Sequence, residues 1–102
     1  MIRLNNLYDN TSPEENSEIF TPLFQNGSIK IECIRSWLKT AGEVYDQDQD
    51  EWVIVLEGEA VLEIDNQMLN LQRGDYLFIP KHTRHRVCST APNTLWLGVF
   101  SS

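Results

Sequence analysis

The chain has 102 residues, the size of one domain, and folding a chain of this length buries roughly two-thirds of its unfolded surface. Acidic residues outnumber basic ones by 15 to 8, so the formal net charge is −7 at pH 7. This charge argues against nucleic acid and anionic membranes as partners. No apolar run reaches the length of a membrane span, and Met1 does not lead into the apolar core of a signal peptide, so we expect a cytoplasmic protein.

The chain begins with a polar stretch, residues 1–17, which we expect to form an N-terminal arm beside a β-barrel spanning 18–102. The apolar segment Ile19–Phe24 follows and contains Pro22, which an edge strand tolerates and a central strand does not. Asn26–Gly27 predicts a tight hairpin turn, because both residue types readily adopt positive backbone angles.

The next strand, over 29–38, alternates in character from one residue to the next. One face carries Ile29, Ile31 and Cys33, and the other carries Lys30, Glu32 and Ile34. Such alternation is typical of an antiparallel sheet or barrel with one face buried and the other partly wet.

Six further short strands are expected along the rest of the chain, at 51–56, 60–64, 68–71, 76–79, 85–89 and 94–100. Turn residues separate them, and Asp65–Asn66 predicts a two-residue hairpin turn. Short strands at regular spacing, without a long amphipathic helix, predict an all-β barrel or jelly roll.

Two stretches carry side chains suited to chemistry. Glu51 opens an apolar run that ends at Gly58, and a second apolar run is stopped by Pro80 and followed by His82 and His85. These are the only two histidines in the protein. A carboxylate at the mouth of one strand and imidazoles at the mouth of another are what a barrel needs to hold a divalent metal.

This pair of stretches resembles the two motifs of the cupin family. The first motif is Gly, five residues, His-x-His, three or four residues, Glu, six residues, Gly; the second is Gly, five residues, Pro-x-Gly, two residues, His, three residues, Asn. Glu51 and Gly58 fit the end of the first motif, and Gly74, Pro80 and His85 fit the second. The sequence segments that read YDQDxDEWV and IPxHxRHRV also resemble segments shared by a set of small single-domain cupins. The resemblance implies a cupin-type double-stranded β-helix, a jelly-roll barrel.

The chain departs from the family pattern in both motifs. Counting back from Glu51, the two histidines of the first motif fall on Tyr45 and Gln47. In the second motif the glycine is His82 and the final Asn is Ser89. The resemblance implies a divalent transition metal, and the candidate ligands are Gln47, Glu51, His85 and His82. Tyr45 is expected to line the pocket.

The identity of the metal depends on His82. If its ring turns inward, His82, His85 and Glu51 make a two-histidine, one-carboxylate set suited to iron. If it does not, one histidine with oxygen ligands suits manganese, zinc or nickel loosely. When the first motif is aligned on Glu51, Tyr45 and Gln47 are expected to face the cavity and the neighbouring aspartates to face solvent.

Three functions remain open at this stage. The first is an enzyme whose metal polarises or oxidises a small oxygen-bearing substrate. The second is a metal-free module that binds or senses a small molecule in the same cavity, and the third is a structural dimer without a ligand. Cupins host dioxygenases, isomerases, decarboxylases and sugar-binding regulators, so the fold does not decide. We expect a homodimer, because Ile19–Phe24 is well placed to pair across a two-fold axis.

Overall fold

The computed structural model describes residues 1–8 and 12–102, which form eight β-strands. The strands are β1 (Ser17–Asn26), β2 (Ile29–Trp37), β3 (Asp50–Glu57), β4 (Glu59–Ile64), β5 (Gln67–Gln72), β6 (Tyr76–Ile79), β7 (His85–Thr90) and β8 (Thr94–Ser101). All of their pairings are antiparallel. Nowhere in the described part of the chain is there a helix long and apolar enough to cross a bilayer. The expected all-β jelly roll is confirmed.

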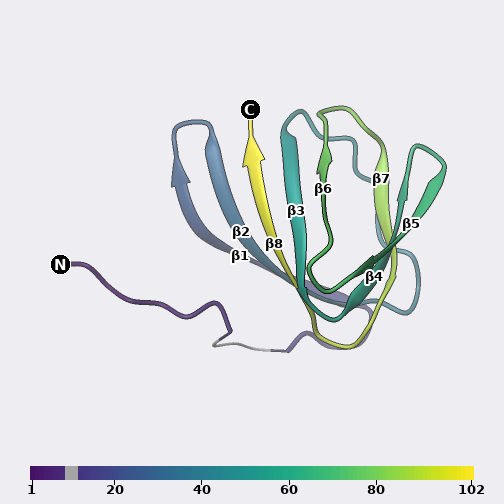
Figure 1. Cartoon of the computed structure of the whole chain (residues 1–102), viewed down its shortest axis with the longest axis horizontal. Helices are drawn as coiled ribbons and strands as arrows, with labels where there is room; N and C mark the ends of the chain where they lie inside the picture. Colours follow the sequence, from purple (N-terminus) through teal and green to yellow (C-terminus); the bar gives the residue numbers. More distant parts are fainter. Residues whose placement is uncertain (9–11) are drawn as a thin grey trace.

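The strands form two sheets that make the walls of the barrel. The larger sheet has the order β1-β2-β8-β3-β6, and the smaller has the order β5-β4-β7. Figure 1 shows the larger sheet on the left and the smaller on the right, with residues 1–8 extending away from both. Strands of both sheets face the space between them, and this is where the site forms.

The core lies between the two sheets and draws on both. Its buried members are Ile34, Val53, Val55, Ala60, Leu62, Leu71, Ile79 and Trp96. Alternate residues of a strand point to the same face of its sheet. Val53 and Val55 of β3 enter the core in this way, and Glu51 lies on the same face two residues earlier. The pleat of β3 thus turns the Glu51 carboxylate inward.

Both expected hairpins are present, but one turn is shifted by a residue. Asp65 and Asn66 form the second turn with φ angles of 47° and 65°, as the sequence predicts. In the first hairpin Asn26 still pairs with Ile29, so the loop is residues 27–28 rather than 26–27. Gly27 supplies the positive φ of that turn, at 59°.

The first strand begins at Ser17 and is an edge strand of the larger sheet, the position that Pro22 tolerates. Its register with β2 shifts between Pro22 and Phe24. Phe20, Leu23 and Phe24 are all exposed. Homodimer formation through this strand stays a prediction, which light scattering tests.

Truncating a core residue of the smaller sheet should destabilise the protein. Leu71 is 4 % exposed and belongs to the core, whereas Met68 on the same strand is 58 % exposed. We expect Leu71→Ala to lower the free energy of unfolding by about 2–5 kcal/mol. Met68→Ala should change it by no more than about 0.5 kcal/mol. Urea unfolding measures both, and equal losses would contradict this placement of the core.

Candidate functional site

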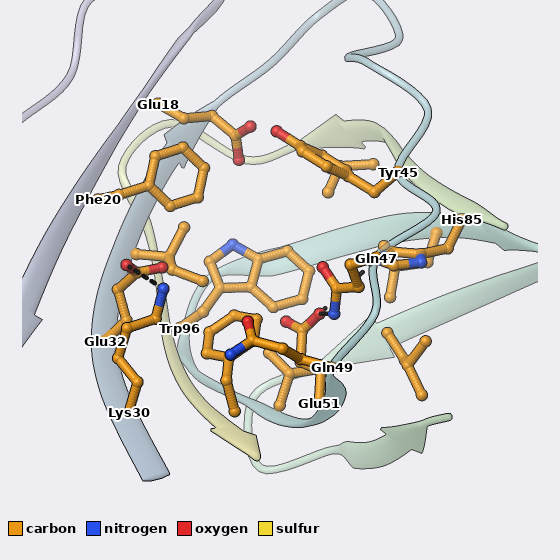
Figure 2. A pocket seen from close by; sticks show the side chains of 16 residues that line it. Glu18, Phe20, Lys30, Glu32, Tyr45, Gln47, Gln49, Glu51, His85 and Trp96 are labelled. Carbon is orange, nitrogen blue, oxygen red and sulfur yellow. Dashed lines mark hydrogen bonds and ion pairs between the residues drawn. The ribbon is translucent and has the colours of Figure 1, made fainter. Parts of the chain in front are cut away.

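A cavity of about 310 Å³ opens between the two sheets and is lined by 16 residues (Figure 2). Its polar lining includes Glu18, Glu32, Tyr45, Gln47, Glu51 and His85. Its apolar lining includes Phe20, Ile34, Val53, Val87, Trp96 and Phe100. A cavity with an apolar floor and a few convergent polar groups has the composition of a small-molecule site, and its volume falls at the lower end of the range for such sites.

Glu51 and His85 form a buried pair at this cavity. They are 8 % and 7 % exposed, and His85 Nε2 lies 3.6 Å from Glu51 Oε1. The other ring nitrogen, Nδ1, lies 2.8 Å from the carbonyl oxygen of Thr83. A carbonyl oxygen only accepts hydrogen bonds, so Nδ1 carries a proton and Nε2 is the atom presented to Glu51.

Gln47 and Tyr45 complete this side of the site. Gln47 donates a hydrogen bond from Nε2 to Glu51 Oε1 at 3.0 Å. Tyr45 exchanges two backbone hydrogen bonds with His85, of 2.8 and 3.1 Å, and the centroids of the two rings are 5.8 Å apart. This bridge holds the segment before β3 against the start of β7. The structure therefore brings together Tyr45, Gln47, Glu51 and His85.

His82 does not join them. Its side chain is 64 % exposed, and Nδ1 lies 3.2 Å from a carboxylate oxygen of Asp46 at the surface. The φ angle of His82 is +60°, in the left-handed region that glycine adopts without steric cost. The backbone turn that suits a glycine here directs the side chain of His82 out of the cavity. The two-histidine ligand set is therefore not assembled.

Burial and nearby charged groups shift several pKa values at the site. Burial lowers the pKa of His85, but the hydrogen bond and charge of Glu51 and the hydrogen bond to the Thr83 carbonyl outweigh burial, so the pKa lies above its usual 6.5. Burial raises the pKa of Tyr45, and carboxylates led by Glu18 raise it further. Burial also raises the pKa of Glu18, against the opposing effect of a hydrogen bond from Ser36.

Several cavity residues were not identified from the sequence. Lys30 and Glu32 both line the cavity, and their side chains lie 3.7 Å apart. Lys30 Nζ also lies 4.9 Å from the centroid of the Phe100 ring. The alternation in β2 was the available signal, because it places Lys30 and Glu32 on one face with the buried Ile34. Glu18 of β1 gave no comparable signal.

The donors present do not fit a retained transition-metal ion. At this end of the cavity the strong donor atoms belong to His85 and Glu51, and their neighbour Gln47 donates its amide N–H to Glu51. Over residues 1–8 and 12–102, no three His, Cys, Asp or Glu side chains converge as a metal site. Protein metal sites that keep an open position usually have three protein ligands.

The chain is similar to known proteins along nearly its whole length. A profile of the cupin domain matches residues 39–98. A protein from Ralstonia eutropha JMP134, described as a "putative mannose-6-phosphate isomerase", is 34% identical, with 99% of each chain covered and a TM-score of 0.86.

Two more distant solved structures share the fold alone. KdgF from Halomonas sp. is 19% identical over 92% of this chain and 87% of that chain, with a TM-score of 0.79. A cupin superfamily protein from Desulfitobacterium hafniense DCB-2 is 22% identical over 87% and 81%, with a TM-score of 0.76. No curated protein sequence matches the chain. The profile match covers more than half of the chain and the Ralstonia protein aligns over its full length, so this chain belongs to the cupin family.

Proposed function

We propose that this cupin binds a small organic molecule in the cavity between its sheets and does so without a resident metal ion. The observation that carries the proposal is the buried Glu51–His85 pair, which faces a cavity of about 310 Å³. This volume lies within the range of known small-molecule sites, so the cavity has room for a small organic molecule.

The polar residues Glu51 and His85 in the cavity lining argue against a purely structural role for this protein. Burying a carboxylate and an imidazole is costly, and well-packed apolar residues of similar volume are often as stabilising or more so. Glu51 and His85 nevertheless stand on the same face as the apolar core residues of their strands. Polar groups held at an open cavity are available to a ligand, which is the use that offsets their cost.

The hydrogen bonds around Glu51 favour the metal-free form of this proposal. Its carboxylate accepts a hydrogen bond from Gln47 and faces the ring of His85. We infer that His85 carries a proton on Nε2 that it shares with Glu51, 3.6 Å away, and that this positive charge balances the buried carboxylate, so a metal ion is not needed for that purpose. The metal-dependent enzyme that the sequence resemblance implies is the competing hypothesis.

Metal content separates the two hypotheses. After incubation with iron(II), manganese, zinc or nickel and desalting, we expect elemental analysis to find well below one metal ion per chain, because only two strong donors converge. Stoichiometric metal in the wild type that is lost in both Glu51→Ala and His85→Ala would support the metal-dependent enzyme instead. His82→Ala is the matched control, since its ring lies outside the cavity.

Filling the cavity should abolish ligand binding. Val87 of β7 lines the cavity, whereas Val61 of β4 lies on the other face of the same small sheet. We expect saturation-transfer NMR with a library of small polar metabolites to find a binder of the wild type. Val87→Phe should lose that binder and Val61→Phe should keep it. A binder retained by Val87→Phe, or a library without any binder, would contradict the proposal.

The pH dependence of His85 tests the shared proton. In a His82→Ala background only one imidazole remains, so its NMR titration belongs to His85, and we expect a pKa above 6.5. Because this folded pKa is raised, the pair stabilises the protein fully below pH 6.5, and the contribution is lost as the pH rises through the folded pKa. Adding Glu51→Gln to this variant should lower the pKa of His85 and remove the loss of stability that accompanies the rise in pH. A titration midpoint at or below 6.5 would refute the shared proton.

A further inference from the structure

Trp96 presents a hydrogen-bond donor that has no acceptor. It is 3 % exposed, and its Nε1 is a buried side-chain nitrogen without a hydrogen-bond partner among the described residues. Buried polar groups in folded proteins are nearly always hydrogen-bonded, so each exception calls for an explanation. Trp96 is also one of the residues that line the cavity, so we consider a molecule bound there as the source of the missing acceptor.

The nitrogen edge of Trp96 points to a particular part of the cavity. Figure 2 shows it directed into the open space on the side of Glu18 and Tyr45, away from the Glu51 carboxylate. Glu18 comes from β1, Trp96 from β8 and Tyr45 from the segment before β3. The Glu18 carboxylate accepts one hydrogen bond, from the Ser36 hydroxyl at 2.6 Å, and a carboxylate can accept more.

The charges of the lining are acidic in balance. Three carboxylates line the cavity, on Glu18, Glu32 and Glu51, against two basic side chains, Lys30 and His85. Lys30 lies 3.7 Å from Glu32, and His85 lies 3.6 Å from Glu51. Each basic group in the lining is therefore already matched to a carboxylate, and Glu18 is left without a cation. The raised pKa of Tyr45, caused by burial and then by Glu18 and other carboxylates, is consistent with this negative field.

We propose that a hydroxyl group of the ligand sits between Trp96 and Glu18, accepting a hydrogen bond from Nε1–H and donating one to the carboxylate, so that the cavity selects uncharged, hydroxyl-bearing molecules over their phosphate monoesters. The inference rests on the proposed function and specifies its ligand class. A hydroxyl both accepts and donates, and so satisfies both side chains.

Charged groups satisfy only one of the two side chains. A phosphate dianion can accept from Trp96, but it cannot donate to Glu18 and is repelled by its charge. An ammonium group can pair with Glu18, but it leaves Trp96 Nε1 without an acceptor. The mannose 6-phosphate named in the description of the Ralstonia relative is accordingly disfavoured as a ligand of this chain.

Matched probes test the proposal on ¹⁵N-labelled full-length protein. The probes are glycerol, erythritol, D-mannose and D-fructose, each beside its phosphate monoester. The protein has three tryptophans, and Trp96→Phe assigns the indole N–H signal of Trp96. We expect at least one uncharged probe to move that signal saturably, and its phosphate monoester to bind about tenfold or more weakly.

Variants of Glu18 give a readout that does not depend on altering Trp96, which is also a core residue. Glu18→Gln removes the charge and keeps a hydrogen-bonding side chain. It should therefore reduce the difference in binding affinity between an uncharged probe and its phosphate ester. Glu59→Gln removes the same charge from an exposed residue that does not line the cavity, and it should leave this difference in affinity unchanged. If Glu18→Gln also leaves the difference in affinity unchanged, the proposed role of the Glu18 carboxylate is overturned.

The remaining outcomes separate this proposal from the proposed function. A phosphate ester that binds as tightly as its parent, or an uncharged probe that binds without moving the Trp96 signal, overturns the hydroxyl assignment. If no uncharged probe binds but the metabolite library yields a binder that Val87→Phe loses, the ligand class is wrong and the proposed function stands. If neither experiment finds a ligand, both proposals fall.

Discussion

A carboxylate buried inside a barrel must be balanced by hydrogen-bond donors or by a positive charge. Glu51 is such a carboxylate, and its neighbours are His85 and Gln47. The ring of His85 faces it at 3.6 Å and the amide of Gln47 donates to it at 3.0 Å. The backbone bridge between Tyr45 and His85 ties the segment before β3 to β7, so the two sheets are joined where the charge is buried. This junction sets the positions of Tyr45, Gln47, Glu51 and His85 at the cavity.

Most of the fold could be predicted from local chemistry. The turn at Asp65–Asn66 forms because these residue types tolerate the positive φ that a two-residue hairpin requires. Pro22 requires an edge strand, and β1 is one. The first turn was displaced by a residue because Asn26 gains a pairing partner, Ile29, in the ladder. Propensity identifies a turn, whereas the pairing of the strands on either side decides which two residues occupy it.

The candidate site could likewise be predicted only in part from the sequence. Tyr45, Gln47 and Glu51 could be placed together because spacing along an extended chain fixes which side chains share a face. The orientation of His82 could not, since it depends on a positive φ that the sequence does not announce for a histidine. Lys30 and Glu32 were missed for a different reason. Alternation reveals two faces, but a polar cavity reverses the usual rule that the apolar face is the inner one.

The two departures from the first cupin motif are best understood together. Tyr45 and Gln47 occupy positions where the family pattern has histidines, and both still face the cavity. Gln47 gives an N–H to the carboxylate that a metal ion would otherwise approach. Tyr45 brings a hydroxyl, held neutral by burial and by the surrounding carboxylates, which raise its pKa. Two positions at which the family pattern has histidines thus carry groups that offer hydrogen bonds, and the proposed recognition of ligand hydroxyl groups rests on this difference.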